Sequence, residues 1–149
     1  MLSVHVSYGA HNIRFAHDWV VKVIRVVGKQ EKIFSGAVGV RFVDNSEIRK
    51  LNKKYRHKNK STDVLSFTTD GPSGSDIGDI IVSVEYVRDM IAGSSDRMRD
   101  HVGMLLIHGF LHIIGYDHMN RPDAKKMWEK QDCASNTLGV HRILFDDFG

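Results

Sequence analysis

The sequence predicts one α+β domain, residues 1–149, in which about four strands form a small sheet flanked by about five helices. Its length of 149 residues and its 42% hydrophobic content suit one core of ordinary size. Strand-like alternation is concentrated in the first 84 residues, whereas helical periodicity dominates the rest. The chain has no internal repeat and no linker long enough to divide it. Together these observations favour a single layered domain.

The first half begins with a strand and a helix. Residues 2–8 alternate apolar and polar side chains, which predicts a strand. Apolar residues then recur every four positions from Phe15 to Val27, which predicts an amphipathic helix that ends at Gly28. A second alternation over residues 38–42 predicts the next strand.

A second helix and two more strands follow. Asp44, with Glu47 three residues later, is typical of a helix N-terminus, and we expect the helix to run to about Tyr55. Residues 64–67 and 78–84 are rich in β-branched and aromatic side chains and predict two short strands.

The last third is predicted to be helical. One helix starts near Asp96 and ends at Gly115, and Pro122 opens another because proline loses no needed hydrogen bond at a first helical position. The last ten residues are expected to form a tail. Three residues are expected to pack the final helix on the core: Met127, Trp128 and Leu138.

Three histidines surround the end of the first of these helices. His108 and His112 are four residues apart and therefore share one helix face. The turn predicted at Gly115 would bring His118 back to complete a set of three metal ligands. The alternative is two core-packed histidines and a surface one. Because the intervening residues are apolar and offer no partner for a buried imidazole, we favour metal ligation.

The predicted site is a catalytic zinc site that holds one Zn²⁺ per chain. Three imidazoles leave one coordination position open, whereas structural zinc sites usually have four protein ligands that include cysteines. Metzincin proteases share this histidine spacing but carry a glutamate general base directly after the first histidine. Gly109 occupies that position here, which argues against a peptidase. A phosphodiester is a suitable substrate if a cation lies nearby.

Basic residues are concentrated between positions 49 and 60. The whole chain has 21 Lys and Arg against 18 Asp and Glu, and this segment supplies seven of the basic residues, with Tyr55 and His57 among them. Such a run is typical of a polyanion-binding surface, although a solvated helix face is the commoner explanation. Arg56 differs from the lysines because its planar guanidinium can hold two phosphate oxygens at once. The expected RNA contacts are Lys53, Lys54, Lys58 and Lys60.

The composition also suggests where the protein works. No apolar run is as long as a membrane span, and the first residues lack the pattern of a signal peptide. The one cysteine, Cys133, cannot form an internal disulfide. We therefore expect a protein without membrane association, located in the cytoplasm or in an organelle matrix of bacterial descent.

Four segments resemble successive motifs of the YbeY family: residues 51–58, 62–67, 78–83 and 108–118. The resemblance extends from about residue 44 to residue 138. Ser61, Thr68 and Met119 depart from it, because the family usually has proline at the first two positions and an acid at the third.

The resemblance implies a small mixed sheet flanked by helices and a zinc-dependent endoribonuclease of single-stranded RNA. Members of the family are implicated in ribosomal RNA maturation, including the 3′ end of the small-subunit RNA, and in ribosome quality control. The implied partners are therefore rRNA, the small ribosomal subunit and its assembly factors. By resemblance His108, His112 and His118 bind zinc, and Arg56 is the basic residue needed for cleavage.

We expect zinc-bound water or hydroxide to attack the phosphate while Arg56 neutralises charge on its oxygens. Asp117 either orients a ligating imidazole or only forms the turn. Two other functions remain open. One is a zinc hydrolase of another substrate class, and the other is a non-catalytic ribosome-associated factor in which zinc only stabilises the fold.

Overall fold

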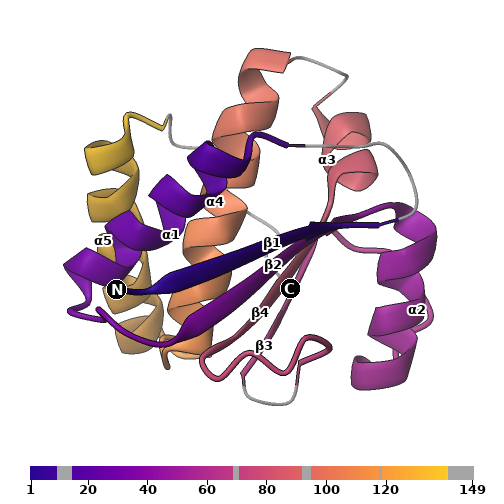
Figure 1. Cartoon of the computed structure of the whole chain (residues 1–149), viewed down its shortest axis with the longest axis horizontal. Helices are drawn as coiled ribbons and strands as arrows, with labels where there is room; N and C mark the ends of the chain where they lie inside the picture. The colour runs from indigo at the N-terminus through magenta and orange to yellow at the C-terminus, as the bar shows by residue number, and fades with distance from the viewer. Residues whose placement is uncertain (10–14, 69–70, 92–94, 118, 141–149) are drawn as a thin grey trace.

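The computed structural model of the chain describes residues 1–9, 15–68, 71–91, 95–117 and 119–140. Within them lie four strands: β1 (Ser3–Tyr8), β2 (Ala37–Val43), β3 (Val64–Phe67) and β4 (Gly78–Ser83). The helices in the same residues are α1 (His17–Gln30), α2 (Asn45–Arg56), α3 (Val84–Met90), α4 (Ser95–Ile113) and α5 (Arg121–Leu138), as Figure 1 shows. The predicted α+β class and element numbers are confirmed.

The four strands form one mixed sheet in the order β1-β2-β4-β3. β1, β2 and β4 are parallel, with Val40 opposite Val6 on one side and Ile80 on the other. β3 runs antiparallel to β4 and forms one edge of the sheet. The edge position matters because the candidate site lies along this strand.

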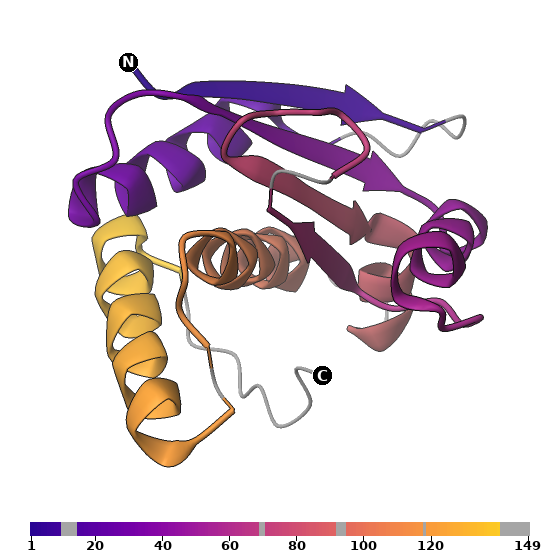
Figure 2. The same ribbon diagram turned by 90° about the horizontal axis from the view of Figure 1, so that it is seen from below.

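Helices cover both faces of the sheet. Alternate residues of β2 and β4, including Phe42 and Ile80, point into the main core with α1 and α4, and α5 packs on the far side of α4 (Figure 2). On the other face Ile48 of α2 packs against Leu65 and Phe67 of β3. Helices α2 and α4 therefore lie on opposite faces of the sheet.

Helix α4, which carries the two histidines, is enclosed over most of its length. Residues 101–111 are all buried, as expected for a helix packed between the sheet and another helix. His108 is 5% exposed, and His112, one turn later, is partly exposed. This packing fixes the backbone from which both imidazoles project.

Among the described residues, no helix has the length and apolar character needed to cross a bilayer.

Three expectations were wrong in detail. Helix α1 runs to Gln30, two residues past the end predicted at Gly28. The last strand ends at Ser83 rather than residue 84, because the Ser83 hydroxyl accepts a hydrogen bond from the Tyr86 backbone N–H and starts α3, which was not predicted. Trp128 is 54% exposed and does not pack on the core, whereas Met127 and Leu138 are buried as predicted. The buried positions of α5 recur at helical spacing, and Trp128 lies one position outside them.

Candidate active site

His108 and His112 lie side by side on α4. Their ring centroids are 4.5 Å apart and their planes are nearly perpendicular, at 85°. This is the arrangement predicted from their spacing of four residues. Two imidazoles this close can present one nitrogen each to a common ion.

A turn at Gly115 ends α4, as predicted. Gly115 has a φ of +113°, a conformation that residues with a Cβ rarely adopt. Its N–H donates to the His112 carbonyl, and the Tyr116 N–H donates to the Leu111 carbonyl, which is the pattern of a Schellman turn. The chain therefore folds back over the end of α4 and returns the Tyr116 carbonyl to His112.

The Nδ1 atoms of both imidazoles contact acceptors. The His112 Nδ1 lies 3.0 Å from the Tyr116 backbone carbonyl, which can only accept, so this nitrogen carries the proton. The His108 Nδ1 lies 2.6 Å from the Oε1 of Gln131 on α5. In this tautomer the lone pair is on Nε2 of each ring, which is the form that binds a metal ion.

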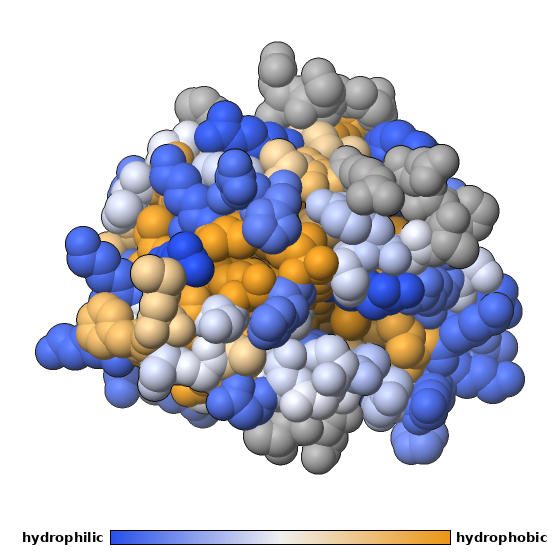
Figure 3. Space-filling model, in the orientation of Figure 1, coloured by the Kyte–Doolittle hydropathy of each residue, from blue (hydrophilic) through white to orange (hydrophobic). Residues whose placement is uncertain are grey.

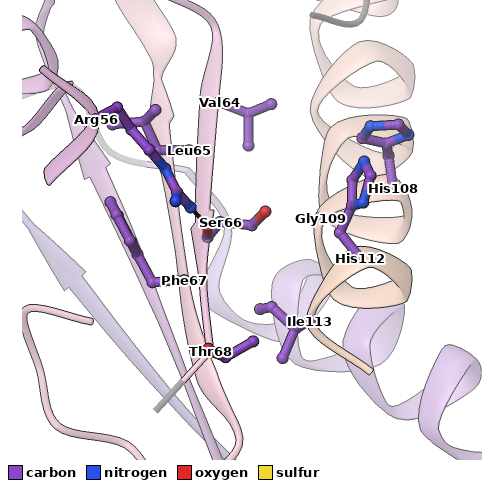
Figure 4. Close-up of a pocket in the computed structure, with 10 residues that line it drawn as sticks. All are labelled: Arg56, Val64, Leu65, Ser66, Phe67, Thr68, His108, Gly109, His112 and Ile113. Atoms are coloured by element: carbon purple, nitrogen blue, oxygen red, sulfur yellow. Dashed lines mark hydrogen bonds between the residues drawn. The ribbon is translucent and has the colours of Figure 1, made fainter. Parts of the chain in front are cut away.

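A pocket of about 420 Å³ lies between β3 and α4. His108, His112 and Gly109 form one wall (Figure 4), and Val64, Ser66 and Thr68 belong to the facing strand segment. The pocket thus joins the two imidazoles to the open edge of the sheet.

Arg56 lines the same pocket from the other side of β3. Its guanidinium donates from Nη2 to the Ser66 carbonyl at 2.6 Å, and its Cζ lies 4.9 Å from the centre of the Phe67 ring. Figure 4 shows β3 between Arg56 and the imidazoles. The predicted pair of cation and metal ligands therefore belongs to one pocket, with the strand edge between them.

Comparison with known proteins identifies the relationship. The family profile described as "Endoribonuclease YbeY" matches residues 7–139. The chain belongs to the YbeY family. A relative named "Endoribonuclease YbeY" from Staphylococcus saprophyticus is 36% identical, over 92% of this chain and 97% of its own length. Another with the same name, from Oceanobacillus iheyensis, is 35% identical over 93% of this chain and 100% of its own.

A solved structure has the same fold. The solution structure of the protein TM1509 from Thermotoga maritima aligns with a TM-score of 0.60 over 91% of this chain and 89% of its own, at 22% identity. The YbeY match begins at residue 7, well before the region from residue 44 that the motifs alone covered.

YbeY proteins are metal-dependent nucleases, and the two described imidazoles suit that chemistry. The third predicted ligand, His118, lies outside the described residues. In the residues that are described, no group of three or more His, Cys, Asp or Glu side chains could hold a metal ion. The donor set visible here is thus the His108 and His112 pair, with both Nδ1 atoms hydrogen-bonded.

Gly109 lies where α4 packs closely against β4. A Cβ at this position would lie 3.1 Å from Cγ2 of Ile80, because α4 passes close to β4 here. A glutamate, the general base of metzincins at this position, would require Ile80 to move. The close approach of α4 to β4 therefore gives a structural reason for a glycine at this position.

The predicted RNA-contact lysines lie on α2 and the segment after it, and all four are exposed. Hydrophilic side chains cover α2, at the right of Figure 3. Asn52 is buried and donates to the Lys60 carbonyl at 2.9 Å, which holds the segment after α2 against the helix. Of the predicted basic residues, only Arg56 lines the pocket. The lysines flank it, and their contact with RNA remains a prediction.

Sequence reasoning missed the residues that support the imidazoles. Gln131 contacts His108 across 23 residues, and Tyr116 is hydrogen-bonded to Glu31 across 85. No local pattern predicts contacts between such distant positions. Asp117, the predicted orienting residue, is exposed, and its role remains a prediction.

The side chain of Tyr116 anchors the turn that holds His112. Its hydroxyl donates to Oε1 of Glu31 at 2.5 Å, and the Glu31 side chain is only 8% exposed. Glu31 also lies 3.7 Å from the Lys130 ammonium of α5. The hydrogen bond to Glu31, followed by burial, raises the pKa of Tyr116 to about 12.

We expect Tyr116→Phe to weaken metal binding several-fold, less than the roughly 10- to 100-fold for loss of a direct supporting contact, because the hydroxyl acts on His112 only through the turn. The lost hydrogen bond should lower the free energy of unfolding by about 1 kcal/mol, because the site is partly exposed. Since the pKa of Tyr116 is raised in the folded state, this stabilisation is complete below pH 10 and is lost as the pH rises towards 12. Urea unfolding of the metal-free proteins should therefore give the same difference in free energy of unfolding between the parent and Tyr116→Phe at pH 7 and at pH 9. Different values at the two pH values would contradict the hydrogen bond from Tyr116 to Glu31.

Proposed function

We propose that this protein is a zinc-dependent endoribonuclease that cleaves single-stranded RNA and acts in maturing ribosomal RNA and in ribosome quality control. Its RNA would be presented by the small ribosomal subunit and its assembly factors, in the cytoplasm or in an organelle of bacterial descent. The observation that carries this proposal is the pocket itself. It joins two imidazoles oriented through Nδ1 to a guanidinium, in a chain of the YbeY family.

In the proposed mechanism His108, His112 and His118 hold the zinc ion. When bound, zinc supplies Lewis acidity and lowers the pKa of water towards neutrality. Arg56 neutralises the negative charge that develops on the phosphate oxygens. Its contacts with Ser66 and Phe67 restrict the guanidinium to the pocket edge, so little reorientation is needed when RNA binds.

The lysines are proposed to bind the RNA backbone beside the pocket, which carries little sequence information. Selection of the cleavage site would then come from single-strand geometry and from presentation of the RNA.

Replacing the four lysines with alanine should weaken RNA binding and reduce its dependence on salt. Each phosphate contact to a single strand contributes about −0.7 to the slope of log K against log salt concentration, so the slope should become less steep by roughly 3. Fluorescence anisotropy with a labelled single-stranded RNA, between about 50 and 200 mM salt, measures both quantities.

A matched variant removes the same charge elsewhere. Four exposed lysines on α1 and α5 are replaced with alanine: Lys22, Lys29, Lys125 and Lys126. The slope of log K against log salt concentration is measured for this variant as well. If the slope falls as much as it does in the variant of the predicted RNA-contact lysines, the effect comes from net charge alone and the proposed contact surface is wrong.

Product analysis tests the proposed reaction class. Incubated with pools of RNA and of peptides, the zinc-loaded protein should shorten RNA only. Cleaved peptides would instead favour a zinc hydrolase of another class. If the zinc-loaded protein cleaved neither pool and removal of zinc unfolded it, as judged by circular dichroism, the metal would be structural and the factor non-catalytic.

A further inference from the structure

Gln131 is a buried polar residue on a mostly apolar helix face. It lies on α5 and is 3% exposed, and Met127 and Ala134, on the same face, are also buried. An apolar side chain would be expected at such a position, because burying an amide costs free energy unless it is hydrogen-bonded. Its Oε1 lies 2.6 Å from the Nδ1 of His108. This contact explains why an amide side chain occupies the buried position.

We propose that Gln131 is a positioning residue for the metal centre, a role that rests on the proposed function. Its Oε1 accepts the Nδ1 proton of His108, which selects the tautomer with the lone pair on Nε2 and fixes the rotation of the ring. His112 receives the same support from a backbone carbonyl, which no substitution can remove. Gln131 is thus the side chain through which the support of one imidazole can be tested.

The chemistry of the amide suits the proposed substrate. A carboxylate at this position would also accept the Nδ1 proton, but it would add a negative charge next to the pocket. The neutral amide orients the imidazole without reducing the positive potential that the metal and Arg56 offer to a phosphate. Gln131 therefore supports metal binding without adding a charge that would repel an anionic substrate.

Two substitutions separate orientation from packing. Gln131→Met has a similar volume and lacks the acceptor, whereas Gln131→Glu keeps an acceptor at the same position. Ser135→Ala is the matched control, because Ser135 is buried one turn further along the same face and its hydroxyl donates to the Asp132 carbonyl. Thermal unfolding of the metal-free variants checks that all of them fold.

The first readout is zinc affinity, measured by titrating metal-free protein in the presence of a competing chelator. Gln131→Met should weaken zinc binding about 10- to 100-fold, while Gln131→Glu and Ser135→Ala bind at least as tightly as the parent. The second readout is the ¹⁵N chemical shifts of the His108 ring. They should show Nδ1 protonated in the parent and a mixture of tautomers in Gln131→Met.

Two results would overturn the proposal. One is a Gln131→Met variant that binds zinc as tightly as the parent. The other is a Gln131→Glu variant whose zinc affinity is weakened as much as that of Gln131→Met, which would point to packing rather than to the acceptor.

If the parent itself bound no zinc, the proposed function would fail and the positioning role with it. If the parent bound zinc and every variant matched it, only the positioning role would fail.

Discussion

His112→Ala is expected to lose stoichiometric zinc and RNA cleavage while it keeps its fold. His112 is only partly buried and lies at the last turn of α4, so its removal leaves the core intact. Loss of a contact that merely supports a ligand lowers metal affinity by about 10- to 100-fold, and loss of a ligand itself should exceed that range. Metal analysis after dialysis and the rate of RNA cleavage measure the two effects.

His17→Ala provides the matched control for this experiment. His17 is an exposed histidine at the start of α1, outside the residues that line the pocket. It should retain one zinc ion per chain and the rate of the parent. If His112→Ala also bound one zinc ion as tightly as the parent, the ligand assignment would be wrong, whatever its activity.

The second large effect is expected for Arg56→Ala, which should cleave RNA about 100-fold more slowly with unchanged zinc affinity. The guanidinium contacts β3 rather than the imidazoles, so its loss leaves the metal ligands in place. Arg56→Lys should recover only part of the rate, because an ammonium cannot contact the Ser66 carbonyl and hold two phosphate oxygens in the fixed geometry of a guanidinium. Single-turnover rates at saturating RNA separate this effect from weaker binding.

Lys22→Ala, an exposed cation of α1, controls for the change in net charge and should cleave at the rate of the parent. A rate for Arg56→Ala equal to that of the parent at saturating RNA would remove Arg56 from the reaction. Arg56 would then only brace the edge of β3 through Ser66 and Phe67.

Local patterns predicted most of the secondary structure, because each of these elements has one face that must be buried. The alternation in β2 and the N-terminal capping of α2 by Asp44, which accepts from the Glu47 N–H at 2.8 Å, were both visible in the sequence. The short helix α3 was missed because it begins at Val84, directly after the last strand residue Ser83, with no glycine or proline to separate the two elements. Trp128 was misplaced because hydrophobicity alone does not distinguish neighbouring positions on α5.

The candidate site was predictable only where its geometry is local. A spacing of four residues determines that His108 and His112 share a face, and Gly115 predicts the turn. The Gln131 and Glu31 contacts depend on how α5 and α1 pack against α4, which the sequence pattern does not determine. The same holds for Arg56, whose place at the pocket depends on the position of β3 at the sheet edge.

Cleavage of a defined RNA by metal-free and zinc-loaded protein tests the central claim most directly. One labelled RNA is presented as a single strand and as a duplex with its complement, and the ends of the products are mapped. We predict internal cuts in the single strand only, which disappear with a chelator and return when zinc is added back. Equal cleavage by chelated and zinc-loaded protein, or no cleavage of the single strand by either, would contradict a metal-dependent endoribonuclease built on His108 and His112.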